Sequence, residues 1–350
     1  MEDAKTPPFV TVVIPVLNEE RFILPMLESL GCLEAGGCLD TPHEIIVVDG
    51  GSTDRTLEIL AGVRAEPGIK VIHNPARIQS AGVNLAAREA DTRTRYMVRI
   101  DAHAVYEPGF VRKVVEALET TGAASVVVPL ITRPLEGMKG FVGAVTVAQR
   151  SVLGNGGSAH RIADTPAGWV DHGHHAGFNL AFFRSIGGYD ETFAVNEDAE
   201  YDVRVHKNGG RVWMEPSAVA WYSPRETARA LARQYFRYGK GRASTVIKHQ
   251  LMPKPRQMFP LAVLAANALG LVGGFAAPIL WAVPLTYFLA CSLAATRQRR
   301  RMGVTDNGYV DAEATVALMV MHMSWGLGFA YGFALSLLSK PRRPNAPEIR

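Results

Sequence analysis

The stretch FVTVVIPVLNEE (residues 9–20) decides the fold of this 350-residue chain. Its first eight residues are mostly apolar and β-branched, without strict alternation, which is typical of a strand that is covered on both faces of a parallel sheet. The runs EIIVVD (44–49) and IKVIHN (69–74) share this character. Strands of this kind, separated by longer segments, predict an α/β domain with a mainly parallel sheet and helices on both of its faces.

The segments between these strands have helical spacing. Asn18 is expected to cap a helix whose apolar residues recur at positions 23, 24, 27 and 30, and Thr53 or Asp54 is expected to cap the next. A third helix is expected over residues 81–90.

Two more strands are predicted at YMVRID (96–101) and SVVVPL (125–130). Parallel sheets bind ligands at the carboxyl ends of their strands. Asp49 and Asp101 both fall at such ends, which makes them the first candidates for a functional site.

The chain changes character near its C-terminus. Residues 258–296 form an uncharged stretch of 39 residues, long enough for two short membrane spans at about 259–276 and 278–296. A third span is expected at 314–339, where 26 residues are uncharged. The sequence therefore predicts a domain over residues 1–245 and a membrane-associated region over residues 246–350.

The topology of the last apolar run stays open. The arginine-rich segment 297–301 is expected on the cytoplasmic side. If the run at 314–339 crosses the membrane once, the basic tail at 340–343 lies outside, against the positive-inside rule. If it lies in the interface, the tail stays inside. A soluble helical domain is the remaining alternative.

The charge distribution and the cysteines indicate which compartment and which classes of partner to expect. Residues 251–350 carry 10 basic and 4 acidic side chains, which favours a membrane surface, and no nucleic-acid-binding motif accompanies them. Cys32, Cys38 and Cys291 form no metal or disulfide pattern, which fits a reducing compartment. The acidic N-terminus and the short apolar run broken by Pro15 do not resemble a signal peptide, so we expect the first domain in the cytoplasm.

Four segments in order resemble the family-2 glycosyltransferases of the GT-A fold: VVIPVLNEE (12–20), IIVVDGGSTDRT (45–56), RIDAH (99–103) and NEDAEYDVRVHKNGG (196–210). The resemblance covers residues 9–245. Within that family, RIDAH, GGYDE (187–191) and QYFRYGKGR (234–242) look like the succinoglycan-type glucosyltransferases, which build exopolysaccharide repeat units on a polyprenyl carrier.

The resemblance implies a binding site for the donor, a UDP-sugar. Pro15 and Glu19 would contact the nucleoside, and Asp49 would accept a hydrogen bond from the uracil ring, as a carboxylate can. Arg77 would lie near the donor, and a surface salt bridge is the equal alternative for this residue.

Asp101-Ala102-His103 stands where the family carries Asp-x-Asp, so both residues are candidate ligands of a divalent cation, Mn²⁺ or Mg²⁺, which would stabilise the diphosphate leaving group. The histidine departs from the family pattern and suits Mn²⁺ at least as well as Mg²⁺. Asp101 would also contact the donor.

Glu197-Asp198 matches the family's Glu-Asp motif. Asp198 is the expected base for the acceptor hydroxyl, and Glu197 would orient the acceptor or support the loop. A single base that acts in direct displacement implies inversion at the anomeric carbon.

Gln234, Arg237 and Tyr238 resemble the Q-x-x-R-W motif of processive synthases with tyrosine in place of tryptophan. They share one helix face and would contact the diphosphate or the acceptor; an amphipathic helix on the membrane is the alternative. His172, in the histidine-rich stretch 169–175, is expected to line the donor-sugar and acceptor pocket.

The function expected from these residues is transfer of a hexose, glucose first, from a UDP-sugar to a polyprenyl-diphosphate-linked saccharide at the cytoplasmic (inner) membrane, with the catalytic domain on the cytoplasmic side. Association with other polysaccharide-assembly proteins would fit. The alternatives are a polyprenyl-phosphate glycosyltransferase, a processive synthase, and a nucleotide-binding membrane scaffold without catalysis.

Overall fold

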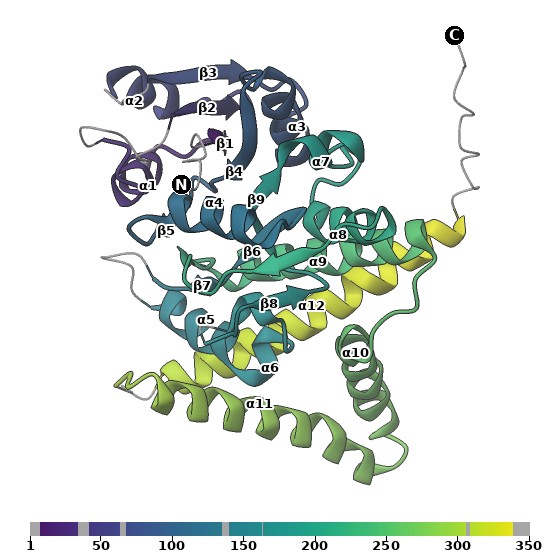
Figure 1. The fold of residues 1–350 in the computed structure, drawn as a ribbon. Coiled ribbons are helices and arrows are strands. Elements are labelled where there is room, and N and C mark those ends of the chain that lie inside the picture. The colour runs from purple at the N-terminus through teal and green to yellow at the C-terminus, as the bar shows by residue number, and fades with distance from the viewer. Residues whose placement is uncertain are drawn as a thin grey trace.

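The computed structural model describes residues 8–33, 42–63, 68–134, 140–162, 164–305 and 309–338. An eight-stranded sheet with the order β3-β2-β1-β4-β9-β6-β10-β8 forms its centre (Figure 1). Its strands are β1 (Phe9–Val16), β2 (His43–Asp49), β3 (Ile69–His73), β4 (Thr94–Arg99), β6 (Ser125–Val128), β8 (Gly168–Val170), β9 (His174–Asn179) and β10 (Val212–Met214). The first four in chain order pair in parallel, and β9 runs antiparallel between β4 and β6.

Helices cover both faces of this sheet, because successive residues of each buried strand point to opposite sides. On β1, Val12 and Ile14 pack in a core with α1 and α4, whereas Val13 packs in a second core with α3, α7 and α8. The helices of this part of the chain are α1 (Ile23–Ser29), α2 (Thr56–Gly62), α3 (Gln79–Glu89), α4 (Phe110–Thr121), α5 (Phe141–Arg150), α6 (Val152–Asn155), η1 (Ala159–Arg161), α7 (Leu180–Ser185), α8 (Glu197–Lys207) and α9 (Ala228–His249). The predicted fold class is confirmed.

Three local predictions were wrong. Neither Thr53 nor Asp54 is the N-cap of α2, because that position is Arg55, which makes no side-chain cap. Asn18 does not cap α1, which begins at Ile23 without a side-chain cap; Asn18 has a positive φ of 58°, and its side chain accepts a hydrogen bond from the Thr53 amide instead. The run SVVVPL is not one strand. It divides at Pro129 into β6 and β7 (Leu130–Thr132), and β7 belongs to a small sheet with β11 (Ala220–Tyr222) and β5 (Ala104–Tyr106).

The apolar C-terminal part forms α10 (Pro255–Gly273), η2 (Pro278–Trp281), α11 (Ala282–Arg301) and α12 (Val310–Leu338). Three helical segments here are long and apolar enough to cross a membrane, in line with the three predicted spans. The predicted domain boundary at residue 245 falls inside α9. Cys38, Ser339 and the basic tail at 340–343 lie outside the described residues.

The three apolar segments differ in how they pack. In the most apolar 18-residue stretch of α12, 39% of the residues are buried. The corresponding values are 11% in α10 and 17% in the segment that contains α11. Glycines let α12 touch the backbone of α9: a Cβ atom at Gly239 would come within 2.0 Å of the Trp325 carbonyl oxygen, and one at Gly328 within 2.0 Å of the Phe236 carbonyl oxygen. Figure 1 shows α12 running beneath the domain that contains the central sheet. It is therefore packed as a part of that domain, whereas α10 and α11 expose most of their apolar surface.

Candidate active site

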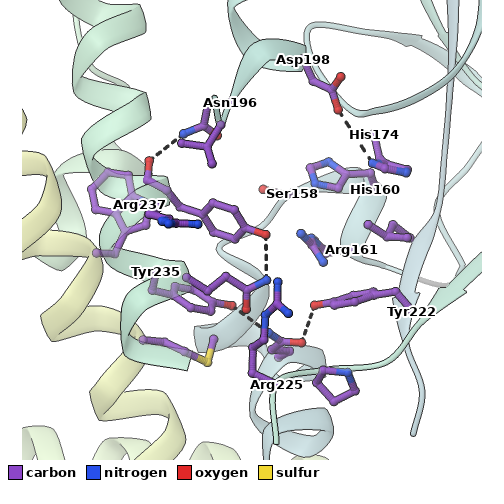
Figure 2. A pocket seen from close by; sticks show the side chains of 18 of the residues that line it. Ser158, His160, Arg161, His174, Asn196, Asp198, Tyr222, Arg225, Tyr235 and Arg237 are labelled. Carbon is purple, nitrogen blue, oxygen red and sulfur yellow. Dashed lines mark hydrogen bonds and ion pairs between the residues drawn. The ribbon is translucent and has the colours of Figure 1, made fainter. Parts of the chain in front are cut away.

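A cavity of about 1050 Å³ connects the carboxyl ends of the central strands with the apolar helices. One end is lined by the segments after β1 and β4 and by the start of α8. The other end is lined by side chains of α10 and α12. α9 connects the two ends, because its Tyr238 carbonyl oxygen accepts a hydrogen bond from Asn196 beside α8 and its Gly239 packs against Trp325 of α12. The segment around η1 also lines the cavity. Figure 2 shows how side chains from these separate segments face one space.

The guanidinium of Arg99 forms the centre of the catalytic end. Arg99 is the last residue of β4 and is only 3% exposed. Its Nη1 atom donates to Oδ1 of Asp198 at 2.7 Å, its Nη2 atom lies 3.3 Å from Oδ2, and its Nε atom lies 3.4 Å from Asp101 Oδ1. The Tyr189 hydroxyl donates to the same Asp198 oxygen at 2.6 Å. A buried arginine thus holds the predicted base and the predicted metal ligand in one ion-paired group.

The two neighbouring carboxyls at the start of α8 have opposite electrostatics. Burial alone would raise the pKa of Asp198, but attraction to Arg99, His175 and His174 together with the hydrogen bond from Arg99 outweighs burial and holds the pKa far below its usual range. Burial and the adjacent charge of Asp198 raise the pKa of Glu197 to about 7. Asp198 is therefore ionised at neutral pH, the state that a base requires, and Glu197 exchanges its proton near neutrality.

Asp101 and His103 line the cavity beside Glu19, whose Oε1 atom lies 3.2 Å from His103 Nδ1. Among the residues that the structure describes, no group of three or more His, Cys, Asp or Glu side chains could hold a metal ion. One carboxylate and one imidazole still fit a divalent cation that takes its remaining oxygens from a bound diphosphate, because such ions in phosphate-transfer sites use few protein ligands. The donor set therefore fits an ion that binds together with the nucleotide.

His172 is fixed by a carboxylate that the sequence interpretation did not consider. Asp202, which is 1% exposed, lies 2.6 Å from His172 Nδ1 and 2.7 Å from His175 Nε2. The other ring nitrogen of His172 lies 3.5 Å from Nη2 of Arg242. Asp202 thus orients His172 so that it lines the cavity, as predicted, beside an arginine.

Three of the predicted donor-binding residues, Pro15, Asp49 and Arg77, do not line the cavity. Both carboxylate oxygens of Asp49 accept hydrogen bonds from the backbone, from Gly51 at 2.9 Å and from Ser52 at 3.0 Å. Arg77 contacts the same turn, with its Nη2 atom 3.4 Å from the Gly51 carbonyl oxygen. Pro15 is half-buried in β1. Their contacts to a nucleoside stay predictions.

The predicted acceptor residues of α9 do reach the cavity. The Gln234 amide donates to the Tyr238 hydroxyl at 3.0 Å, one helical turn along, and Arg237 is exposed beside them. The cavity therefore brings together nine of the predicted residues and leaves three outside. The nine are Glu19, Asp101, His103, His172, Glu197, Asp198, Gln234, Arg237 and Tyr238. The three are Pro15, Asp49 and Arg77.

Two functional residues that the sequence interpretation missed had visible signals. Arg99 is a lone charge inside the apolar strand YMVRI, where it needs a buried partner. Asp202 lies four residues after Asp198, hence on the same face of a helix.

Comparisons with known proteins agree with this geometry. The sequence model of the family described as "Glycosyl transferase family 2" matches residues 11–186. The chain is 40% identical to succinoglycan biosynthesis protein ExoA of Rhizobium meliloti, over 91% of this chain and 93% of that protein. It is 24% identical to the dolichyl N-acetyl-alpha-D-glucosaminyl phosphate 3-beta-D-2,3-diacetamido-2,3-dideoxy-beta-D-glucuronosyltransferase of Methanococcus voltae, over 69% of this chain and 74% of that one.

A solved structure extends the likeness to the whole fold. The mannosyltransferase PcManGT of Pyrobaculum calidifontis, in complex with GDP-Man and Mn²⁺, superposes with a TM-score of 0.54 at 18% identity, covering 95% of this chain and 89% of that one. At this identity the likeness concerns the fold alone. Together with the family match and the similarity to the Rhizobium protein, it leads to one conclusion: the chain belongs to glycosyl transferase family 2 and is a glycosyltransferase with the GT-A fold.

Proposed function

We propose that the protein transfers a hexose, with glucose as the first candidate, from a UDP-sugar to a polyprenyl-diphosphate-linked saccharide in exopolysaccharide synthesis, with inversion at the anomeric carbon. One observation carries this proposal: a single cavity reaches from ion-paired Asp198 to side chains of the apolar helices α10 and α12. The similarity to a succinoglycan biosynthesis protein supports a role in exopolysaccharide synthesis. The similarity to an enzyme named for a dolichyl-phosphate-linked acceptor supports an acceptor on a polyprenyl carrier.

In the reaction, the acceptor hydroxyl oxygen attacks the anomeric carbon while the bond from that carbon to the UDP oxygen breaks. Asp198 accepts the hydroxyl proton, and UDP leaves as the anion. A carboxylate with a low pKa is a weak base, but the hydroxyl becomes strongly acidic as its oxygen bonds to carbon, so Asp198 can receive the proton late in the step. Arg99 and Tyr189 hold Asp198 in place for this transfer. Glu197 orients the acceptor.

The donor end requires neutralisation of the leaving diphosphate. We assign a divalent cation, Mn²⁺ or Mg²⁺, to Asp101 and His103, where it would stabilise the negative charge of departing UDP. Asp49, Pro15 and Glu19 would bind the nucleoside, with Arg77 beside the donor.

We place the catalytic domain, residues 1–245, on the cytoplasmic face of the inner membrane and assign residues 246–350 to the membrane. α12 packs along α9, which carries exposed charged residues such as Arg233 and Lys240. A helix bound along such a partner does not cross the bilayer alone, so the interfacial arrangement of α12 is favoured, with the tail on the cytoplasmic side. Association with other polysaccharide-assembly proteins belongs to the same proposal.

The acceptor class can be tested with membranes that contain the protein, radiolabelled UDP-glucose and Mn²⁺. The acceptors offered are bare polyprenyl phosphate and polyprenyl-diphosphate saccharides that differ in their terminal sugar, and the lipid extract is resolved after incubation. We expect one added hexose on a diphosphate-linked saccharide, absent with Asp198→Asn membranes.

Other outcomes would contradict the proposal in different ways. Label on bare polyprenyl phosphate would identify a polyprenyl-phosphate glycosyltransferase, and a long labelled polymer would identify a processive synthase. Absence of turnover with every sugar nucleotide tried would favour a nucleotide-binding scaffold.

A further inference from the structure

A group of three arginines lines the cavity. They are Arg161 in η1, Arg242 in α9 and Arg256 in α10, and all three line the cavity. No salt bridge joins any of them to a carboxylate within the described parts of the chain. The contacts of Arg242 and Arg256 are to neutral acceptors: Arg242 Nη2 lies 3.5 Å from His172 Nε2, and Arg256 Nη1 lies 3.3 Å from the Gly157 carbonyl oxygen.

Arg242 lies within reach of the charge of Arg256. Burial and the neighbouring charge of Arg256 lower the pKa of Arg242 to about 10, which is the direction expected where positive charge is not neutralised. Arg161 faces the same cavity between Tyr222 and Arg237, as Figure 2 shows. Arg161 and Arg242 are half-buried, and positive charges held together in a cavity cost free energy unless an anion joins them. An anionic ligand in the cavity would offset this cost.

Apolar side chains continue the cavity beyond these arginines. Phe259 and Pro260 of α10 and Met321 and Trp325 of α12 line its far end. The two helices meet here, because a Cβ atom at Gly326 would come within 2.8 Å of the Pro260 carbonyl oxygen. Phe259 is 43% exposed although it lines the cavity. The cavity thus reaches the exposed apolar surface of α10.

We propose that Arg161, Arg242 and Arg256 form the binding site for the diphosphate of a lipid-linked acceptor, and that its hydrocarbon chain leaves between α10 and α12. Asp198 lies one helical turn from Asp202, which holds His172 beside Arg242. Arg256, whose charge acts on Arg242, lies three residues before Phe259 on α10. The cavity surface therefore runs from a carboxylate base through arginines to apolar side chains. An acceptor of this class carries a sugar hydroxyl, a diphosphate and an isoprenoid in the same order, and arginine matches phosphate oxygens through paired hydrogen bonds. This assignment rests on the proposed function for the identity of the acceptor.

The test measures binding of farnesyl diphosphate to the full chain in detergent by titration calorimetry, with farnesol, inorganic pyrophosphate and UDP as comparison ligands. The variants are Arg242→Gln and Arg256→Gln. Arg229→Gln is the matched control, because Arg229 lies on α9 and does not line the cavity. Arg256 is exposed, so its variant is expected to fold.

We expect each variant to weaken farnesyl diphosphate binding about tenfold, the loss of one charge-assisted hydrogen bond. Binding of farnesol and of UDP should not change, and pyrophosphate should bind more weakly than farnesyl diphosphate because it lacks the apolar contacts. Unchanged farnesyl diphosphate binding in both variants would overturn the proposal. Weakened UDP binding would overturn it too, by assigning these arginines to the donor.

This experiment separates the subsite from the proposed function. If farnesyl diphosphate binding depends on the arginines but no lipid-linked saccharide is ever glycosylated, the subsite stands and the proposed acceptor fails. If glycosylation proceeds and both variants keep the KM for the lipid-linked acceptor, the proposed function stands and the subsite fails.

Discussion

The two ends of the cavity differ in how their charges are compensated. At the catalytic end, Arg99 is buried and forms ion pairs with both Asp101 and Asp198. At the other end, Arg242 and Arg256 face the cavity without a carboxylate among the described residues. The first arrangement positions groups before any substrate arrives, as catalysis requires. The second depends on a ligand to supply the missing charge, as a binding site does.

The largest effect should follow from removing the base. Asp198→Asn keeps the shape of the side chain, and its one oxygen can still accept hydrogen bonds from Arg99 and Tyr189. The amide cannot accept the hydroxyl proton. We expect kcat to fall by about 10²–10⁴ with UDP affinity unchanged. Glu197→Gln should lose much less. Steady-state transfer assays with calorimetric UDP binding measure both quantities, and near-normal turnover of Asp198→Asn would show that the base is misassigned.

The second-largest effect should be a loss of stability when the ion pairs of Arg99 with Asp101 and Asp198 are removed. Arg99→Met leaves Asp101 and Asp198 buried without their shared cation, which typically costs about 3–5 kcal/mol. Arg99→Lys, the control, keeps the charge but loses the two-pronged contact, so its loss should be smaller. Thermal unfolding followed by tryptophan fluorescence measures this. An unchanged midpoint in Arg99→Met would mean that the two carboxylates do not depend on Arg99.

The arginine end depends on the close contact of α9 with α12. Gly239→Ala would force a methyl group against the Trp325 carbonyl oxygen, and overpacking of this kind costs about 1–3 kcal/mol. Gly143→Ala is the control, since a methyl group at Gly143 in α5 would meet nothing within 4 Å. We expect Gly239→Ala to raise the acceptor KM and lower the unfolding temperature, and Gly143→Ala to do neither. Equal behaviour of both variants would remove α12 from the account.

The smallest effect concerns the metal. His103→Asp exchanges an imidazole for a carboxylate, which Mg²⁺ prefers, so the ratio of activity with Mg²⁺ to activity with Mn²⁺ should rise about tenfold. Electron paramagnetic resonance of Mn²⁺ titrated into the protein with UDP gives a second measurement, in which the variant should show altered Mn²⁺ affinity. If both quantities match the unaltered protein, His103 is not a ligand.

Much of the fold could be predicted from local sequence. The run at β1 ends where the sequence predicted, because a parallel strand buried on both faces is a continuous apolar segment. The prediction of one strand over SVVVPL was wrong because Pro129 has no backbone N–H and divides the run between two sheets. The prediction that Asn18 caps α1 was wrong because its side chain accepts a hydrogen bond from the Thr53 amide, 35 residues away, and not from an amide of the helix that follows it.

Some residues of the candidate site could likewise be predicted from local sequence, and others could not. Asp101 and Asp198 were recognisable because they belong to short motifs. Arg99 joins two of those motifs across 99 residues, so only the folded chain shows its role. The positions of Arg242 and Arg256 depend on how α9 and α10 pack, and no local pattern determines that.

The most direct test asks whether the two ends bind phosphate groups independently. The affinity of the full chain for farnesyl diphosphate is measured by calorimetry in detergent, without UDP and with saturating UDP and Mn²⁺. Two separate sites predict the same affinity in both conditions, within about twofold. Loss of farnesyl diphosphate binding in the presence of UDP would mean that both ligands compete for one phosphate site, and would contradict the account.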